Sequence, residues 1–319
     1  MLDAVIIGGG AAALSAALYL SRGGKKVEVF ERNQIGGDLG QIPELENYPG
    51  YQGSGEGLAK VMREQAEQAG AKISYGECHR VEDCAELRKE DPERTDLPER
   101  GFYVSIDDEV VYAKSVLVAC GAESRRLDVE LNVPVSYCAL CDGELAKDKK
   151  VAVVGGANSA VQEALYLAPM VKELTVITHS RLKAGPVLQE RLRQHDNVKV
   201  LENLEATAEL LNKFEHVFVF IGKEPKAGFL QELQRRHVVK KDAKFFGLEI
   251  IKEVELIDED GYIITGAKGK SEHETAQTGL YAAGDIRQGA VCQVITAAGD
   301  GAAAAIEMLE FLNGAESVS

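Results

Sequence analysis

The chain has 319 residues, a formal net charge of −15 and six cysteines. This length is enough for two domains of ordinary size, each with its own hydrophobic core, so stability requires neither disulfides nor a structural metal. The acidic charge argues against a nucleic-acid-binding protein, because phosphate neutralisation needs a basic surface. The chain has no signal-like opening segment and no apolar run near the length of a membrane span. The sequence therefore predicts a cytoplasmic protein without a membrane partner.

The first glycine-rich segment lies between a predicted strand and a predicted helix, and a second predicted strand follows them. In the pattern Gly8-x-Gly10-x-x-Ala13 the first glycine makes a tight turn, the second lets the backbone approach a pyrophosphate, and the alanine allows close packing. Glu31 ends the second strand, where a carboxylate can accept hydrogen bonds from a ribose. These residues predict a dinucleotide-binding βαβ unit.

The same order of elements returns at 149–181, where a strand, a glycine turn, a helix and another strand follow one another. Two such units predict an α/β protein with two doubly wound, Rossmann-like domains. Between the two units, the polar segment 82–101 is typical of a solvated loop. Four further strands and a C-terminal helix are predicted at 102–108, 109–122, 216–222, 279–285 and 292–312.

The segment CALCDG at 138–143 places two cysteines two residues apart, directly before an aspartate. Such a pair can be half of a zinc site, a redox dithiol or an accident of composition. Zinc needs four ligands, and neither a second CxxC nor an HxxxH stands nearby. A redox dithiol needs neighbouring sulfurs, at least one with a lowered pKa, and a CxxC that opens a helix supplies both. Asp142 could exchange protons with a thiolate through water, so the sequence favours a redox dithiol.

The segments VSYCALCDG and VAVVGGANSAVQEALYL resemble the low-molecular-weight flavin-dependent thioredoxin reductases, class II of the pyridine nucleotide-disulfide oxidoreductases. Four further motifs are similar to the flavin site of that family and follow in its order: GGDLGQIPELENYPGY, VLVACGA, IGKEP and YAAGDIRQGAVCQVITAAGDG. The resemblance implies that the second doubly wound domain is inserted in the first. Residues 1–122 and 223–319 would form a discontinuous FAD-binding domain, and residues 123–222 a trimmed, dithiol-bearing domain of the NADPH type.

The resemblance also assigns cofactor-binding residues. Those expected around the adenine half of FAD are Gly8, Gly10, Ala13 and Glu31. Those expected near the pyrophosphate, the ribityl chain or the isoalloxazine ring are Gly36, Gly37, Asn47, Gly121, Gly284, Asp285, Gln293 and Val294. No metal site is expected.

In the reaction that the resemblance implies, electrons pass from a donor through FAD and the dithiol to thioredoxin or a thioredoxin-like protein. Cys141 would be the sulfur nearest the flavin, Cys138 would attack the partner's disulfide, and Asp142 would be the proton donor. Rotation of the smaller domain would make the dithiol accessible, and the protein would be a homodimer. Two other functions stay open: a reductase for a peroxidase-linked redoxin, and a non-catalytic FAD redox sensor.

The second glycine turn departs from the family. It reads Gly155-x-Ala157-x-x-Ala160, and the methyl group of Ala157 lies where close approach to a pyrophosphate is needed. After the following strand only Arg181 stands for the three arginines by which the family holds NADPH, with Lys183 as a substitute. These departures leave the electron donor open between NADPH and a non-nucleotide carrier such as reduced ferredoxin.

Segment lengths differ from the family as well. Residues 197–222 have room for two strands and a helix, whereas residues 226–260 are enlarged. The four cysteines outside the CxxC share no motif spacing, and the sequence favours an inert or packing role for them.

Overall fold

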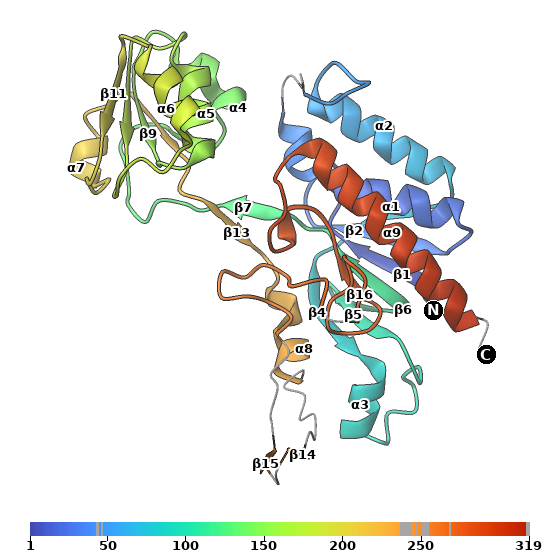
Figure 1. Cartoon of the computed structure of the whole chain (residues 1–319). Coiled ribbons are helices and arrows are strands. Elements are labelled where there is room, and N and C mark those ends of the chain that lie inside the picture. The colour runs from blue at the N-terminus through green and yellow to red at the C-terminus, as the bar shows by residue number, and fades with distance from the viewer. Residues whose placement is uncertain are drawn as a thin grey trace. The chain divides into compact units, whose positions relative to one another are not determined.

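A computed structural model describes residues 1–42, 45, 47–236, 244–245, 248–249, 255–267 and 269–316. The chain forms two compact units, one made of Met1–Ala122 with Pro225–Ser319 and the other of Glu123–Glu224. At the two crossings between them, β7 (Ala122–Ser124) and β13 (Lys223–Pro225) pair as a two-stranded ribbon (Figure 1). The second unit is therefore inserted in the sequence of the first.

The sheet of the first unit has seven strands in the order β3-β2-β1-β6-β5-β4, and β16 also pairs with β6. The strands are β1 (Leu2–Ile7), β2 (Val27–Glu31), β3 (Lys72–Tyr75), β4 (Cys78–Asp83), β5 (Phe102–Ile106), β6 (Glu109–Val118) and β16 (Leu280–Ala282). Ala4 and Ile6 belong to one buried cluster, and Val5 and Ile7 to another. Both faces of β1 are thus covered, which explains its unbroken apolar run.

Three helices lie side by side over one face of this sheet: α1 (Ala11–Arg22), α2 (Gly55–Gln68) and α9 (Val294–Glu316) (Figure 1). Helices α1 and α9 pack backbone to backbone, because a Cβ added to Gly301 would lie 2.0 Å from the carbonyl oxygen of Ala12. Small residues in both helices permit this approach. The packing brings the start of α9 to the N-terminal end of α1.

The other end of the sheet is an antiparallel meander of β4, β5 and β6. A helix, α3 (Cys84–Glu90), follows β4 directly, so the prediction of a solvated loop at 82–101 is wrong for this part. Asp83 caps α3 by accepting hydrogen bonds from the backbone amides of its first turn, and both Cys84 and Leu97 are buried. Four of the seven residues of α3 are charged, and so short a segment gives no clear helical periodicity, which is why the sequence did not reveal this helix.

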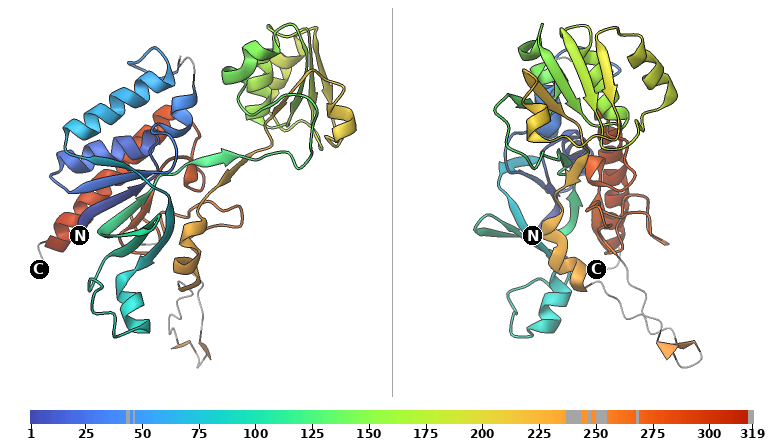
Figure 2. Two further views of the ribbon diagram at one scale, coloured as in Figure 1. Left: turned by 180° about the vertical axis from the view of Figure 1, so that it is seen from behind. Right: turned by 90° about the vertical axis from the view of Figure 1, so that its left-hand side faces the viewer.

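The second unit contains a five-stranded parallel sheet in the order β11-β10-β9-β12-β8. Its strands are β8 (Val135–Ser136), β9 (Lys150–Val154), β10 (Glu173–Ile177), β11 (Val198–Leu201) and β12 (His216–Val219). Helices α4 (Ala139–Asp142), α5 (Asn158–Leu167) and α6 (Pro186–Arg193) lie on one face, and α7 (Ala208–Leu211) lies on the other (Figure 2). The predicted fold class, two doubly wound α/β domains, is confirmed.

The predicted content of residues 197–222 is confirmed, since β11, α7 and β12 are two strands and a helix. Most of the enlarged segment 226–260 lies outside the described residues. The remaining elements are η1 (Gly37–Gln41), η2 (Gly143–Ala146), η3 (Gly228–Leu230), α8 (Gln231–Arg236), β14 (Lys244–Phe245), β15 (Leu248–Glu249) and η4 (Gly284–Ile286). Among the described residues, no helix combines the length and the apolar character needed to cross a membrane.

Candidate active site

The first glycine turn accepts no side chain at its first position. Gly8 has φ +103°, and a Cβ built there would lie 2.5 Å from the carbonyl oxygen of Ala119 and 2.6 Å from the Cα of Cys120. The amide of Gly8 donates to the carbonyl of Phe30 at 2.8 Å. The turn is therefore wedged between β2 and the end of β6, which points the start of α1 along the carboxyl edge of the sheet.

The start of α1 has open space beside Gly10 and backbone amides that no side chain caps in the described part of the chain. Among the described residues, a Cβ on Gly10 would find one neighbour within 4 Å beyond the adjoining chain, the carbonyl oxygen of Gly36 at 3.8 Å. In the described part of the chain no side chain caps α1, whereas Ser54 caps α2 and Asp83 caps α3. An uncapped helix N-terminus beside a bare backbone suits a pyrophosphate, so the residues present fit the phosphates of FAD.

Glu31 is held in place by two backbone amides. Its Oε2 accepts from the amide of Gly9 at 2.7 Å, and its Oε1 accepts from the amide of Asn33 at 2.8 Å. Each carboxylate oxygen keeps a second lone pair that can accept a ribose hydroxyl. The expected ribose acceptor is thus pre-oriented beside the glycine turn.

A second pair of glycines folds against the first turn. Gly36 and Gly37 have φ +109° and +53°, and the amide of Gly36 donates to the carbonyl of Gly9 at 2.8 Å. A Cβ on Gly37 would lie 3.7 Å from the Cα of Gly10, its nearest neighbour. Two bare backbones therefore face each other across the start of α1, as a cradle for a ligand requires.

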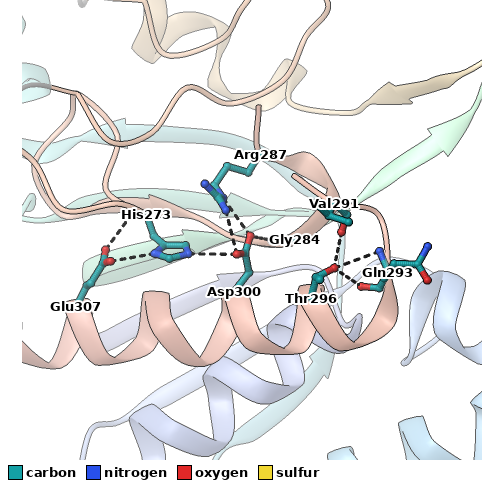
Figure 3. Close-up of polar contacts among 8 residues, drawn as sticks. All are labelled: His273, Gly284, Arg287, Val291, Gln293, Thr296, Asp300 and Glu307. Atoms are coloured by element: carbon teal, nitrogen blue, oxygen red, sulfur yellow. Dashed lines mark hydrogen bonds and ion pairs between the residues drawn. The ribbon is translucent and has the colours of Figure 1, made fainter. Parts of the chain in front are cut away.

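Residues far apart in sequence meet at the start of α9. The Nδ2 of Asn47 donates to the Oε1 of Gln293 at 3.0 Å across 246 positions. The hydroxyl of Thr296 donates to the carbonyl of Val291 and accepts from the amide of Gln293 at 3.3 Å (Figure 3). This brings Asn47, Gln293 and the first residue of α9, Val294, to one place. The sequence did not single out Thr296, which fixes the turn before α9.

The turn that carries Asp285 is anchored to α9 by an ion pair. Asp300 accepts from the amide of Gly284 at 3.2 Å and binds the guanidinium of Arg287 at 3.0 and 2.9 Å (Figure 3). Gly284 has φ +76° and Gly121, at the end of the neighbouring strand β6, has φ +66°. Gly284 and Gly121 thus lie at turns where a left-handed backbone is needed.

His273 lies between two carboxylates behind this turn. Its ring nitrogens lie 2.9 Å from Oε1 of Glu307 and 3.4 Å from Oδ1 of Asp300, and the residue is 3% exposed (Figure 3). Burial lowers the pKa of His273, but hydrogen bonds to both carboxylates outweigh burial and raise it. Burial raises the pKa of Asp300, but hydrogen bonds from His273 and Arg287 outweigh burial and lower it to about 2. Sequence spacing could not reveal this network, because 27 and 34 positions separate the histidine from its partners.

Cys138 is disulfide-bonded and stands directly before α4, the short helix that the CxxC opens. The amide of Asp142 closes the helix by donating to the carbonyl of Cys138 at 3.2 Å. The backbone of Cys141 belongs to α4, but its side chain lies outside the described part of the structure. The cysteine before the helix is therefore in a redox-capable bond.

The other four cysteines are not in disulfides. Burial raises the pKa of Cys78 and of Cys120 to about 12, and the pKa of Cys84 to about 11. Such thiols hold no thiolate at neutral pH and are poor nucleophiles. Among the described residues, no cluster of three or more His, Cys, Asp and Glu could hold a metal ion.

The second glycine turn is covered by the segment after β10. The amides of Lys183 and Ala184 both donate to the carbonyl of Gly156, at 2.7 and 3.0 Å, and the amide of Gly185 donates to Oδ1 of Asn158 at 2.8 Å. In the same segment the amide of Leu182 donates to Oε1 of Glu202 at 2.7 Å. A carboxylate from the end of β11 therefore bonds the segment where the family's arginines would hold a 2'-phosphate.

Comparison with known proteins agrees with this geometry. Residues 2–301 match the family model of the pyridine nucleotide-disulphide oxidoreductases. The chain is 35% identical over 317 residues to a thioredoxin reductase of Treponema pallidum, covering 95% of this chain and 94% of the relative. The chain belongs to the thioredoxin reductase family. It is accordingly an FAD-dependent oxidoreductase.

Other relatives and solved structures extend the match over the whole length. A thioredoxin reductase of Listeria innocua is 31% identical, covering 94% of this chain and 90% of the relative. The crystal structure of thioredoxin reductase from Lactococcus lactis has a TM-score of 0.74 and 29% identity, covering 98% of this chain and 100% of that chain. The crystal structure of T. acidophilum thioredoxin reductase has a TM-score of 0.72 and 26% identity, covering 100% of this chain and 99% of that chain. The predicted family, FAD dependence and enzyme class are confirmed.

Proposed function

We propose that this protein reduces the disulfide of thioredoxin, with Cys138 and Cys141 as its own redox pair. The observation that carries the proposal is the disulfide of Cys138 directly before α4, in a chain whose relatives are named thioredoxin reductases. The first unit would bind FAD and the second would carry the dithiol. Cytoplasmic location and homodimer formation stay predictions.

The first unit contains a candidate residue set for each part of the cofactor. Gly8, Gly10 and Ala13 would leave room for the pyrophosphate, and Glu31 would accept from the ribose. Bound FAD would supply a two-electron carrier that can reduce the disulfide. The residues that would hold the ribityl and ring portions are Gly36, Gly37, Asn47, Gly121, Gly284, Asp285, Gln293 and Val294.

The reduced pair would act on the partner by thiol–disulfide exchange. The thiolate of Cys138 attacks one sulfur of thioredoxin's disulfide, which forms a mixed disulfide and releases the partner's other sulfur as a thiolate. Asp142, the residue directly after Cys141, gives that thiolate a proton. Cys141 then attacks Cys138, which releases the second sulfur of thioredoxin and regenerates the disulfide of the enzyme. Two electrons and two protons pass to thioredoxin in total.

Replacement of Cys138 by serine tests the dithiol directly. Cys138→Ser protein should lose thioredoxin reduction by at least about 1,000-fold, because the attacking sulfur is gone, yet its flavin should still be bleached by the donor. Cys292→Ser is the matched control, since Cys292 is exposed and not in a disulfide. Reduction of thioredoxin by Cys138→Ser protein at the wild-type rate would refute the proposed function. A wild-type enzyme that reduces only a peroxidase-linked redoxin, or no disulfide partner at all, would support one of the two other functions.

The geometry of the second unit favours an electron donor other than NADPH. A 2'-phosphate carries negative charge, and the Glu202 carboxylate holds the amide of Leu182 in the segment that would have to receive it. Arg181 and Lys183 are exposed. Arg181 alone has a planar guanidinium that can bind a phosphate through two hydrogen bonds, and the ammonium of Lys183 does not replace a second one. We therefore favour a reduced carrier protein, such as a ferredoxin, as the donor.

Anaerobic mixing separates the two donors. NADPH should leave the visible absorption of the flavin unchanged over minutes, whereas reduced ferredoxin should bleach it, with dithionite as the positive control. Bleaching by NADPH within seconds would contradict the choice of donor and leave the dithiol function intact.

A further inference from the structure

A half-buried carboxyl group reaches the dithiol turn from the helix packed against it. Oε2 of Glu163, on α5, accepts a hydrogen bond from the backbone amide of Ala139 at 3.2 Å. Ala139 is the first residue of α4, directly after Cys138, and is completely buried. The contact therefore joins α5 to the peptide that follows the redox cysteine.

The surroundings of Glu163 make its charge costly. Burial raises the pKa of Glu163, the amide of Ala139 lowers it, and the net effect is a raised pKa. Within the described residues these are the two influences on this carboxyl group, and no cation lies among them. By contrast its neighbour on α5, Gln162, is exposed. A half-buried acid with a backbone amide as its partner responds to a new charge nearby.

The first amides of a helix normally favour a thiolate on the cysteine that opens it. In this chain one of those amides, that of Ala139, is committed to a carboxyl group. A carboxylate hydrogen-bonded to the peptide after Cys138 brings a negative charge close to that residue. Like charge disfavours the ionised form of Cys138.

The opposite side of the turn is also held by a buried side chain. The hydroxyl of Ser136, two positions before Cys138, pairs with Nε2 of His216 at 2.9 Å, and His216 is 1% exposed. Burial and Lys149 lower the pKa of His216 while Asp142 raises it, and the net effect is a lowered pKa. A neutral His216 adds no cation that could offset the carboxylate of Glu163.

We propose that Glu163 is a positioning residue of the dithiol, which fixes the peptide after Cys138 and whose charge makes the Cys138 thiol less acidic. This inference rests on the proposed function, because it takes Cys138 as the attacking sulfur. Glu163 acts through the Ala139 amide and through its charge.

Two variants separate the effect of the hydrogen bond to the Ala139 amide from the effect of the charge. Glu163→Gln keeps an oxygen that can accept from the Ala139 amide but removes the charge, whereas Glu163→Ala removes both. Gln162→Ala, on the exposed neighbour in the same helix, is the matched control. Each change is made in the holoenzyme, and bound flavin and the far-ultraviolet circular dichroism spectrum verify that the variants fold.

The acidity of Cys138 is measured without any partner protein. In a Cys141→Ser background, the rate of iodoacetamide labelling of the peptide that carries Cys138 is followed by mass spectrometry from pH 5 to 10. Glu163→Gln and Glu163→Ala should both lower the apparent pKa of labelling by about one unit, while Gln162→Ala leaves it in place. A labelling profile of Glu163→Gln that superimposes on that of the parent would overturn the role of the charge.

The effect of the hydrogen bond to the Ala139 amide is measured as the rate of exchange with thioredoxin, with both cysteines present. Prereduced enzyme is mixed with oxidised, tryptophan-containing thioredoxin, and tryptophan fluorescence reports thioredoxin alone because this chain has no tryptophan. Glu163→Ala should slow the exchange about tenfold, and Glu163→Gln should restore at least half of the parent rate. Equal rates for Glu163→Ala and the parent would overturn the positioning role. Failure of thioredoxin to react with the parent enzyme would refute the proposed function but leave the labelling result valid.

Discussion

The two glycine turns of this chain have nearly the same backbone and different surroundings. Gly8 and Gly155 both have positive φ, +103° and +141°, and both lie against the end of a neighbouring strand. The residues that precede the two helices are also alike, with φ −79°, ψ −172° at Gly10 and φ −87°, ψ 179° at Ala157. The backbone conformation of the turn is therefore nearly the same in both units.

The difference lies in what faces the middle of each turn. A Cβ on Gly9 would lie 2.9 Å from the side chain of Glu31, whereas a Cβ on Gly156 would lie 2.5 Å from Oγ1 of Thr178. The threonine thus occupies the position of Glu31, the proposed ribose acceptor, and the Ala157 methyl group occupies the position of the bare Gly10. A doubly wound unit can keep its fold while a few side chains change what it binds.

The largest expected effect comes from filling either turn. Gly8→Ala places a Cβ 2.5 Å from a backbone oxygen and Gly155→Ala places one 2.3 Å from the carbonyl oxygen of Phe220, and both need a positive φ. Each should cost about 3 kcal/mol or more in stability. Only Gly8→Ala should also lose bound flavin, measured by absorbance after gel filtration. Equal flavin loss in both variants would show that the two turns do not act separately.

The sequence was sufficient to predict the elements whose patterns are local. The glycine turns, the CxxC before a helix and the small-residue C-terminal helix all follow from spacings within a few residues, and the structure contains each of them. The pairing of Asn47 with Gln293 could be inferred only from a resemblance, because 246 positions separate them.

Other parts of the site left no local signal. His273 reads as an isolated histidine until folding places it beside Glu307, and Glu163 reads as an ordinary helix-surface acid until α4 packs on α5. These contacts depend on how elements pack, which a periodic pattern does not specify. The sequence did not predict the helix at 84–90 because most of its residues are charged and Cys84 is its one fully buried side chain, so no apolar face is apparent.

The side chain beside each turn gives the next effect. Glu31→Ala should weaken FAD binding about 30-fold, since it removes a charged acceptor and leaves the amide of Gly9 without it. The matched change in the other turn, Thr178→Val, should leave FAD affinity within about twofold. Titration of apoenzyme with FAD, followed by flavin fluorescence, measures both. A larger loss in Thr178→Val than in Glu31→Ala would reverse the assignment of the two units.

The ion network behind the first turn predicts a pH window. The pKa of Asp300 is lowered to about 2, so its contribution is present above pH 4 and is lost as pH falls toward 2. The pKa of His273 is raised, so its contribution is full below about pH 6.5 and is lost as pH rises through the folded-state value. Asp300→Asn should cost about 2 kcal/mol at pH 6 and flatten the acid limb, while His273→Gln should flatten the alkaline limb. Thermal unfolding from pH 3 to 9 measures both, and unchanged limbs in the variants would contradict the network's role.

The smallest effect is expected where the second turn is restored toward the first. Ala157→Gly removes one methyl group but leaves the segment after β10 bonded to Gly156 and the Glu202 carboxylate in place. NADPH should therefore bleach the flavin of Ala157→Gly no more than about twofold faster than in the parent, because charge and the bonded segment still oppose the 2'-phosphate. The double variant Ala157→Gly, Glu202→Gln should bleach faster than either single variant. If Ala157→Gly alone bleached tenfold faster, the methyl group would be the obstacle, and the two turns would differ by one atom group rather than by the charge around them.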